Sequence, residues 1–271
     1  MAHQHNPQEK QMADESMLRT LKAQAEAIWP QEVNFLKRYK LPQAAQILDV
    51  GCGSGEICGR LARQMPEASI TGVDLIESHL QYASQRHTEF SQRLQFNVDD
   101  AMNLSFEDDR FDLCVNRHML QSVPDADRVI TEMIRVTKPG GWLHIIPEDY
   151  GMIHCSSVNS EVEDLFLKGA FGFARHVGTD LRIGRKAYRV LKQHGLKNVS
   201  VNYITVDTEK VPRDIIRDIF IAWRDGYATA MDEAGSLDLK TASAYFDEFI
   251  RCLEDENEYV VWQVPLLSAV I

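Results

Sequence analysis

An apolar segment that runs directly into three alternate glycines is the feature that most constrains how this chain can fold. The segment reads Ile47-Leu48-Asp49-Val50-Gly51-Cys52-Gly53-Ser54-Gly55 and leads into a helical pattern. Glycine permits the sharp turn that joins a strand to a helix, and it lets a ligand approach the backbone without a Cβ in the way. The segment therefore predicts the first unit of a parallel α/β sheet whose strand end faces a ligand.

Further short apolar segments, separated by helix-like stretches, continue this pattern along the chain. The predicted strands are residues 46–50, 68–75, 93–98, 110–115, 141–147, 199–207 and 259–267. Strands that alternate with helices form right-handed parallel βαβ units. We therefore predict a doubly wound, mostly parallel, seven-stranded sheet of the Rossmann-like α/β class. Asp125 is expected to cap the helix that precedes the fifth strand.

The parts of the chain on either side of this core are predicted to be helical. Apolar residues recur at helical spacing over 17–28 and 33–39, and Trp29-Pro30 between them indicates a break. We expect residues 1–43 to form an N-terminal tail and lid helices, and residues 44–271 to form one domain. A helical cap at about 212–253 is expected as an insertion between the last two strands.

Composition narrows the possible functions. The chain has 44% hydrophobic and 25% charged residues and no apolar run long enough to span a bilayer, and its start lacks the pattern of a signal peptide, so we expect a cytoplasmic protein without a membrane partner. A net charge of -11 disfavours binding to nucleic acid. The five cysteines are scattered without a CxxC pair, so we expect neither a disulfide nor a metal site.

An acidic residue ends the second predicted strand. Asp74 stands nineteen residues after Gly55, where a carboxylate can accept both hydrogen bonds of a ribose diol, as in adenosine binding. Nicotinamide dinucleotides are disfavoured because their fingerprint needs a third glycine where this chain has Glu56, whose carboxylate would repel a pyrophosphate. A strand-to-helix turn without a ligand is the structural alternative.

Five motifs occur in order along residues 46–146: LDVGCGSG, GVDL, DDAMNL, RFDLCVNRHMLQSV and RVTKPGGWLHI. In this order and spacing they resemble the class I S-adenosylmethionine-dependent methyltransferases, in the branch that acts largely on small molecules. The resemblance implies transfer of a methyl group from S-adenosyl-L-methionine to an O, N or C atom of a small-molecule acceptor, with S-adenosyl-L-homocysteine as product. It leaves the acceptor and the oligomeric state open.

Other functions remain alternatives at this point. The same cofactor motifs would serve a cyclisation, an alkyl transfer or a cofactor-binding module without catalysis. The Asn-Pro-Pro-aromatic tetrad of enzymes that methylate amines of DNA or amides of proteins would follow the fourth strand, where this chain reads Asn116-Arg117-His118-Met119. That difference disfavours such macromolecular substrates.

The resemblance also implies which residues hold the cofactor, namely Asp49, Gly51, Cys52, Gly53, Gly55, Asp74, Leu75, Asp99, Asp100, Ala101, Asn116 and Arg117. Asp49 and the glycine loop would face the methionine part, and Asp74 would bind the ribose hydroxyls. Asp100, with the backbone at Ala101, would recognise the adenine amino group, although Asp99 could take this role. Asn116 and Arg117 would lie beside the amino-acid part.

A base is needed only if the acceptor is a hydroxyl or a protonated amine, because the departing thioether requires no acid. The candidates follow the fourth and fifth strands: His118, Glu148 and Asp149. An imidazole can accept a proton near neutral pH, and either carboxylate could serve as base or hold a substrate cation. Cofactor packing is the alternative for His118, and helix capping or a solvated turn is the alternative for the carboxylates.

Several side chains are candidates for contact with the acceptor: Tyr150, His154, Arg175, Arg182, Trp223 and Tyr227. Aromatic rings with a polar tip suit a substrate pocket as well as the edge of a core. An arginine could bind a carboxylate or phosphate, although a solvated or ion-paired arginine is the alternative.

Overall fold

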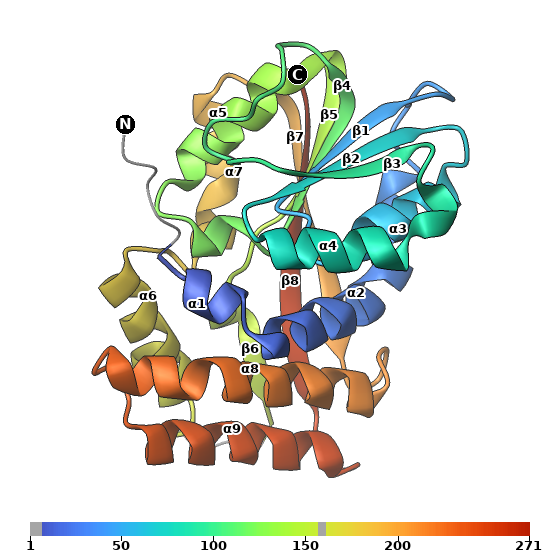
Figure 1. Ribbon diagram of the computed structural model, residues 1–271. Helices are drawn as coiled ribbons and strands as arrows, with labels where there is room; N and C mark the ends of the chain where they lie inside the picture. Colours follow the sequence, from blue (N-terminus) through green and yellow to red (C-terminus); the bar gives the residue numbers. More distant parts are fainter. Residues whose placement is uncertain (1–6, 157–160) are drawn as a thin grey trace.

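The computed structural model describes residues 7–156 and 161–271 and is built around a single eight-stranded sheet (Figure 1). Its strands are β1 (Gln46–Val50), β2 (Ser69–Asp74), β3 (Leu94–Val98), β4 (Phe111–Arg117), β5 (Thr137–Ile146), β6 (Ile153–Cys155), β7 (Lys197–Asp207) and β8 (Val260–Val270). The order is β3-β2-β1-β4-β5-β8-β6, and β7 also pairs with β8. Strands β1 to β5 are parallel, whereas β8 is antiparallel to its three neighbours. The predicted doubly wound, mostly parallel α/β sheet is therefore confirmed.

The prediction of seven strands was one short. Residues 153–155 form β6, which pairs with the first residues of β8. A strand of three residues is too short to produce an alternating pattern that could be recognised in the sequence.

Helices cover both faces of the sheet, with α3 and α4 on one side and α5 and α7 on the other (Figure 1). The helices of this part are α3 (Glu56–Gln64), α4 (Glu77–Arg86), α5 (Ala126–Val136), α6 (Phe171–Val177) and α7 (Ile183–Gln193). Three short 3-10 turns are η1 (Thr88–Phe90), η2 (Leu120–Ser122) and η3 (Tyr150–Met152), and η4 (Leu165–Ala170) is a π-helix. Asp125 caps α5 as predicted, because its carboxylate accepts a hydrogen bond from the backbone N–H of Arg128 at 2.9 Å. Val129 and Met133 of α5 are fully buried against the sheet.

The N-terminal region differs from the two helices that were predicted. A short helix α1 (Glu9–Met12) precedes one continuous helix, α2 (Glu15–Leu36), which passes through Pro30. Proline inside a helix removes one hydrogen bond and costs about 3 kcal/mol. Burial of Ala27, Ile28 and Leu36 offsets this cost. Tertiary packing has therefore overridden the local break signal.

A helical cap closes the end of the molecule at which the parallel strands finish. Helices α8 (Arg213–Glu233) and α9 (Leu239–Glu254) lie between β7 and β8 in the chain, where the insertion was predicted. They run side by side, and α2 lies next to α8 (Figure 1). The rings of Phe220 and Phe249 stack with centroids 5.3 Å apart, and the apolar core of the cap continues into α2 and β8. Across the two described ranges, every helix is too short or too polar to cross a membrane.

Candidate active site

The glycine loop adopts the strained conformation that its sequence suggests. Gly51, Gly53 and Gly55 have φ values of +73°, +51° and +72°, which favour glycine. A Cβ on Gly53 would lie 2.6 Å from Cδ1 of Leu21, so the end of the Leu21 side chain would have to move for a larger residue. The loop therefore presents bare backbone to the cavity, whose wall Leu21 also lines.

Asp74, at the end of β2, holds this loop in place. Its Oδ2 accepts a hydrogen bond from the backbone N–H of Gly53 at 2.8 Å, and its Oδ1 accepts one from the N–H of Ile76 at 2.9 Å. A carboxylate oxygen has two lone pairs, so each oxygen can accept one further hydrogen bond. Asp74 is only partly buried, and it can therefore receive the two hydroxyls of a ribose.

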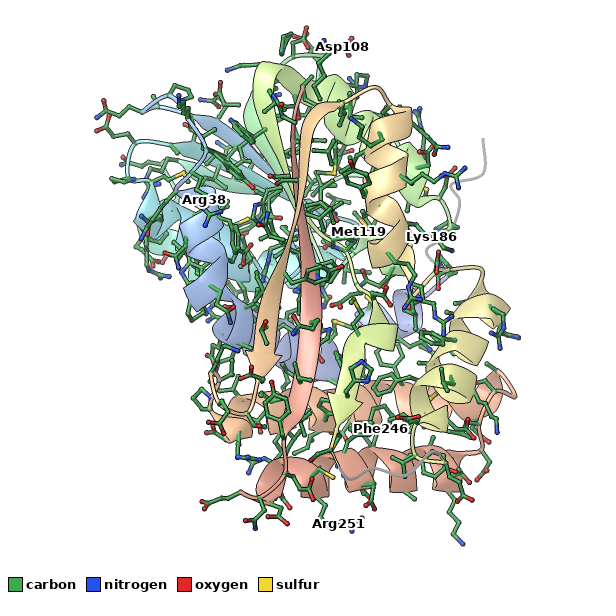
Figure 2. All side chains as sticks on the ribbon, turned by 180° about the vertical axis from the view of Figure 1, so that it is seen from behind. Arg38, Asp108, Met119, Lys186, Phe246 and Arg251 are labelled. Atoms are coloured by element: carbon green, nitrogen blue, oxygen red, sulfur yellow. The ribbon has the colours of Figure 1, made fainter. Side chains whose placement is uncertain are left out.

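One cavity runs from the glycine loop to the helical cap. The sequence candidates on its wall are Gly51, Gly53, Asp74, Arg117, His118, Tyr150, Trp223 and Tyr227. Met119, which follows β4, and Phe246 of α9 mark its two sides, and Figure 2 shows Met119 between the sheet and the cap and Phe246 inside the cap. The carboxyl ends of β1, β2 and β4 thus share one space with the cap.

A buried charge network ties α2 to the sheet beside this cavity. Oε1 of Glu32, which is fully buried, lies 3.0 Å from Nε of Arg117 and 3.0 Å from Nε2 of His144. The hydroxyl of Tyr39 lies 2.7 Å from Nδ1 of His144. Burial would raise the pKa of Glu32, but Arg117 and His144 outweigh it, so this pKa lies below its ordinary value. Glu32 is therefore an ionised carboxylate that holds Arg117 at the cavity.

Arg117 keeps unused hydrogen-bond donors at the cavity wall. Its contact with Glu32 is an ion pair without hydrogen-bond geometry, and among the described residues neither its Nε nor its Nη2 has an acceptor. A buried donor without a partner is costly. The carboxylate of an amino-acid ligand would supply the missing acceptor.

His118 and Glu148 form a buried pair at the strand ends. Nδ1 of His118 forms a hydrogen bond with Oε1 of Glu148, which is fully buried, whereas Nε2 has no partner in the part of the chain that is described. Because an ionised carboxylate can only accept, we assign the Nδ1 proton to this bond, which leaves Nε2 as an acceptor. His118 has a φ of +53°, and its N–H bonds the carbonyl of Ile146 at 2.9 Å, which fixes the strained backbone.

Both carboxylate oxygens of Asp149 accept hydrogen bonds from groups outside the cavity. Its two carboxylate oxygens accept hydrogen bonds from Nε and Nη2 of Arg185 at 2.6 Å and 2.8 Å, and the N–H of Gly151 donates to Oδ1 at 3.1 Å. Its carboxylate does not line the cavity. The structure thus places Asp149 in the capping position of η3, away from Nε2 of His118.

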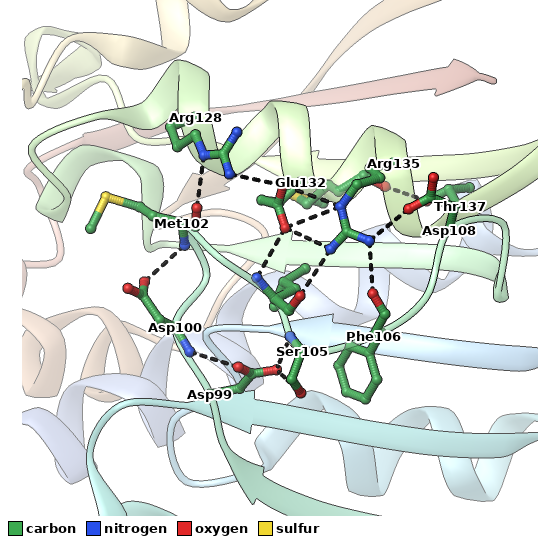
Figure 3. Close-up of polar contacts among 12 residues, drawn as sticks. Asp99, Asp100, Met102, Ser105, Phe106, Asp108, Arg128, Glu132, Arg135 and Thr137 are labelled. Atoms are coloured by element: carbon green, nitrogen blue, oxygen red, sulfur yellow. Dashed lines mark hydrogen bonds and ion pairs between the residues drawn. The ribbon is translucent and has the colours of Figure 1, made fainter. Parts of the chain in front are cut away.

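Asp99 and Asp100, in the loop after β3, form different hydrogen bonds (Figure 3). Asp99 accepts hydrogen bonds from Asp100 N–H at 3.0 Å and from the N–H and hydroxyl of Ser105 at 3.0 Å and 2.9 Å. Within residues 7–156 and 161–271, the Asp100 side chain accepts only from the N–H of Met102 at 2.8 Å, through Oδ1. Asp100 therefore has the freer carboxylate, while Asp99 shapes the loop.

Helix α5 fixes the same loop from the other side (Figure 3). Glu132 accepts a hydrogen bond from the N–H of Leu104 at 3.0 Å, and Arg135 donates to the carbonyls of Leu104 at 2.9 Å and Phe106 at 2.7 Å. Burial would raise the pKa of Glu132, but hydrogen bonding to Arg135 outweighs it and holds this pKa below its ordinary value. The position of Asp100 is thus set by a rigid support.

The remaining candidates for the cofactor lie around the loop without lining the cavity. Asp49 is buried beneath it and accepts a hydrogen bond from Sγ of Cys58 at 3.2 Å; burial raises the pKa of Asp49 to about 6. Asn116 is buried and donates to the carbonyl of Val50 at 2.8 Å. Cys52 and Gly55 are buried, Ala101 is half-buried and Leu75 is exposed.

The six candidates for acceptor contact divide into two groups. Tyr150, Trp223 and Tyr227 line the cavity, with the rings of Tyr150 and Trp223 5.2 Å apart. His154 is exposed on β6 and Arg175 is exposed on α6. The guanidinium of Arg182 lies 4.0 Å above the ring of Phe171. None of these last three side chains lines the cavity.

The sequence analysis missed several residues at this site, including Glu32, Thr20, Leu21 and Gln24 of α2 and Phe166, Phe173 and Met231 near the cap. The position of Glu32 in the sequence does indicate a buried charge. It stands four residues after Ile28 and four before Leu36, so a carboxylate interrupts the apolar stripe of the helix. A charge in a buried stripe requires a partner.

Comparison with known proteins agrees with this geometry. A family model described as a methyltransferase domain matches residues 42–195, more than half of the chain. The chain is 37% identical over 100 residues to the ubiquinone/menaquinone biosynthesis C-methyltransferase UbiE of Desulfotalea psychrophila, covering 37% of this chain and 40% of that protein. It is 35% identical over 111 residues to the methyltransferase GfsG of Streptomyces halstedii, covering 40% of each. The chain spans less than half the length of these relatives.

Two solved structures show the same fold. A phosphoethanolamine N-methyltransferase of Haemonchus contortus, in complex with phosphomonomethylethanolamine and S-adenosylhomocysteine, superposes with a TM-score of 0.56 at 20% identity, covering 89% of this chain and 52% of that one. A geranyl diphosphate C-methyltransferase of Streptomyces coelicolor gives a TM-score of 0.54 at 15% identity, covering 89% and 79%.

Proposed function

This chain belongs to the class I S-adenosylmethionine-dependent methyltransferases, and from that membership we propose that it transfers a methyl group from S-adenosyl-L-methionine to an O, N or C atom of a small molecule. The observation that carries the proposal is the cavity whose wall includes Gly53, Asp74 and His118, and among the described residues Nε2 of His118 has no hydrogen-bond partner. The residues proposed for the cofactor and the proposed base thus line one cavity. Relatives named as quinone and phthiotriol methyltransferases support a small-molecule acceptor.

Asp74 and Arg117 on the cavity wall, together with Asp100 outside it, suit this cofactor. When bound, S-adenosyl-L-methionine supplies a methyl group on a sulfonium sulfur, which leaves as a neutral thioether. We propose that the ribose hydroxyls bind Asp74, that the amino-acid carboxylate binds Nη2 of Arg117, and that the adenine amino group binds Asp100. The glycine loop contains no lysine or arginine that would neutralise a phosphate, and Gly51 and Gly53 admit a close ligand.

The chain itself would supply a base and a dry environment. Glu148 holds the imidazole of His118 through Nδ1, and Nε2, which has no partner among the described residues, accepts the proton of the acceptor. Asp149 acts as a positioning residue, because its pairing with Arg185 fixes the turn that follows Glu148. Phe166 and Trp223, which are almost fully buried, exclude water from the reacting atoms.

The setting of the reaction is part of the proposal. All five cysteines are free thiols, and Cys52, Cys58, Cys114 and Cys252 are buried. We place the enzyme in the reducing cytoplasm, acting on a small molecule without nucleic acid or membrane as partner.

Titration calorimetry with S-adenosyl-L-homocysteine tests the proposal. Asp74→Asn removes the charge from the ribose acceptor, and the loss of one charge-assisted hydrogen bond should weaken binding by about 1.5 to 3 kcal/mol, or roughly tenfold to a hundredfold. Asp218→Asn, on the exposed face of α8, is the matched control and should bind as the wild type does. Equal affinity of Asp74→Asn and the wild type would remove Asp74 from the ribose site, and a wild type that binds no S-adenosyl-L-homocysteine would refute the function.

A further inference from the structure

We propose that the acceptor is an uncharged, mainly apolar molecule that carries a phenol or enol hydroxyl, and that His118 takes the proton of this hydroxyl. The inference rests on the proposed function, because it assigns the part of the cavity that the cofactor would leave free. It follows from three properties of the cavity wall: its aromatic side chains, its lack of an available charge, and its uncharged polar groups.

Aromatic side chains form the cap side of the cavity. Phe166, Phe173, Trp223 and Phe246 line it, and each is less than 7% exposed. Tyr150 connects them to the strand end, with its ring 5.2 Å from Trp223 and 6.3 Å from Phe166. Such walls bind flat apolar molecules by burying their faces, and each further apolar carbon adds roughly 0.8 kcal/mol.

No free charge on this wall would compensate a charged acceptor. Arg117 is the one lining guanidinium among the described residues; it is paired with Glu32, and we assign its remaining donors to the carboxylate of the cofactor, so none is left for the acceptor. Arg175 is exposed, and Arg182 stacks on a phenylalanine outside the cavity. A carboxylate or phosphate would therefore be buried without a partner, which is strongly unfavourable.

A cationic acceptor also lacks a carboxylate. Asp74 lies at the glycine loop, where we place the ribose, and Glu148 is fully buried behind His118. Aromatic faces could attract a cation, but a protonated amine has no lone pair for attack and must first lose its proton. A neutral hydroxyl enters the same walls at a lower desolvation cost.

Uncharged hydrogen-bonding groups remain available at the wall. The hydroxyls of Tyr150 and Tyr227 form no hydrogen bond with any described residue, and burial raises the pKa of both above its ordinary range, so they stay neutral donors. Oε1 of Gln121 and Nε2 of His118 are buried and have no hydrogen-bond partner in the two described ranges. These groups match hydroxyl and carbonyl oxygens on an otherwise apolar molecule.

The step balances with the groups present and the proposed cofactor. The O–H proton moves to Nε2 of His118, while the proton on Nδ1 stays on Nδ1 and keeps its hydrogen bond to Glu148. The electron pair left on the phenolate or enolate forms the new bond to the methyl carbon, at oxygen or at the conjugated carbon. The carbon–sulfur bond breaks, and its electron pair remains on the thioether. No oxidant, reductant or metal is required.

A set of probes with one ring system tests the charge preference without turnover. Binding of 1-naphthol, 1-naphthoate, 1-naphthyl phosphate and 1-naphthylmethylammonium is measured by calorimetry on the wild type with S-adenosyl-L-homocysteine present. We expect 1-naphthol to bind at least about tenfold more tightly than each charged probe. A charged probe that binds as tightly as 1-naphthol, or a 1-naphthol that does not bind, overturns the inference. Failure of S-adenosyl-L-homocysteine itself to bind would instead refute the proposed function.

A spectroscopic probe tests the proton acceptor separately. 4-Nitrophenol changes its absorption when it ionises, so we expect the wild type to bind it with a larger phenolate fraction than the buffer holds at the same pH. His118→Asn should bind it as the neutral phenol, whereas His176→Asn, an exposed histidine of α6, should behave as the wild type does. If His118→Asn does not fold, Glu148→Gln provides the second variant, with a reduced phenolate fraction expected. An unchanged spectrum in both variants, or no phenolate in the wild type, overturns the role of His118.

Discussion

Asp49, which is buried beneath the glycine loop, should make the free energy of unfolding depend on pH. The substitution Asp49→Asn removes this contribution. Burial raises the pKa of Asp49 from its ordinary 3.8 to about 6. The folded state therefore holds this proton more tightly than the unfolded chain does. The stabilisation from the neutral carboxyl is complete below about pH 4 and is lost as the pH rises through about 6.

The magnitude follows from these two pKa values. Ionisation of Asp49 costs the folded state about 2 kcal/mol at about pH 5 and about 3 kcal/mol at about pH 7.5. Asp49→Asn mimics the neutral carboxyl and keeps an acceptor for the Cys58 thiol. The free energy of unfolding of Asp49→Asn, relative to the wild type, should therefore increase by about 1 kcal/mol between these two pH values.

Urea unfolding of both proteins at the two pH values measures this difference. The variant of an exposed carboxyl, Asp218→Asn, should show a difference from the wild type that does not change with pH. If the difference for Asp49→Asn is equally constant, or if it shrinks as the pH rises, Asp49 is not a buried acid with a raised pKa and the reasoning is refuted.

Two further substitutions test the packing around the cavity. Gly53→Ala places a methyl group 2.6 Å from Cδ1 of Leu21 and puts alanine at a φ of +51°, so binding of S-adenosyl-L-homocysteine should be weakened in calorimetry. Leu21→Ala in the same chain should partly restore it, and full binding by Gly53→Ala alone would contradict the close approach of α2. Glu32→Gln leaves Arg117 buried without its counter-charge and should lower the free energy of unfolding by about 3 kcal/mol in urea at neutral pH. An unchanged midpoint would show that the ion pair does not anchor α2.

The parts of the fold that the sequence predicted are those with strong local signals. The apolar segment 46–50 is bounded by glycines and coincides with β1, and Asp125 has the side chain that a helix start requires. The continuity of α2 through Pro30 had no local signal, because packing of that helix against the rest of the molecule outweighs the lost hydrogen bond. The same holds for β6, whose three residues are ordered by their pairing with β8.

Some residues of the site could likewise be predicted from the sequence, whereas others could not. Asp74 and His118 could be located from sequence because they end strands, and parallel strand ends converge at one edge of the sheet. Glu32 approaches Arg117 only through the docking of α2, which no spacing in the sequence encodes. The loop containing Arg175 suggested an anion site, but the helical turn directs that side chain to solvent.

A crystal structure of the wild type grown with S-adenosyl-L-homocysteine is the most direct measurement. We predict electron density for the nucleoside between the glycine loop and α2, with both ribose hydroxyls on the carboxylate of Asp74 and the sulfur facing the space beside Nε2 of His118. Density at another place, or a cavity that stays empty under saturating ligand, would contradict the assignment of this chain's cavity to methyl transfer.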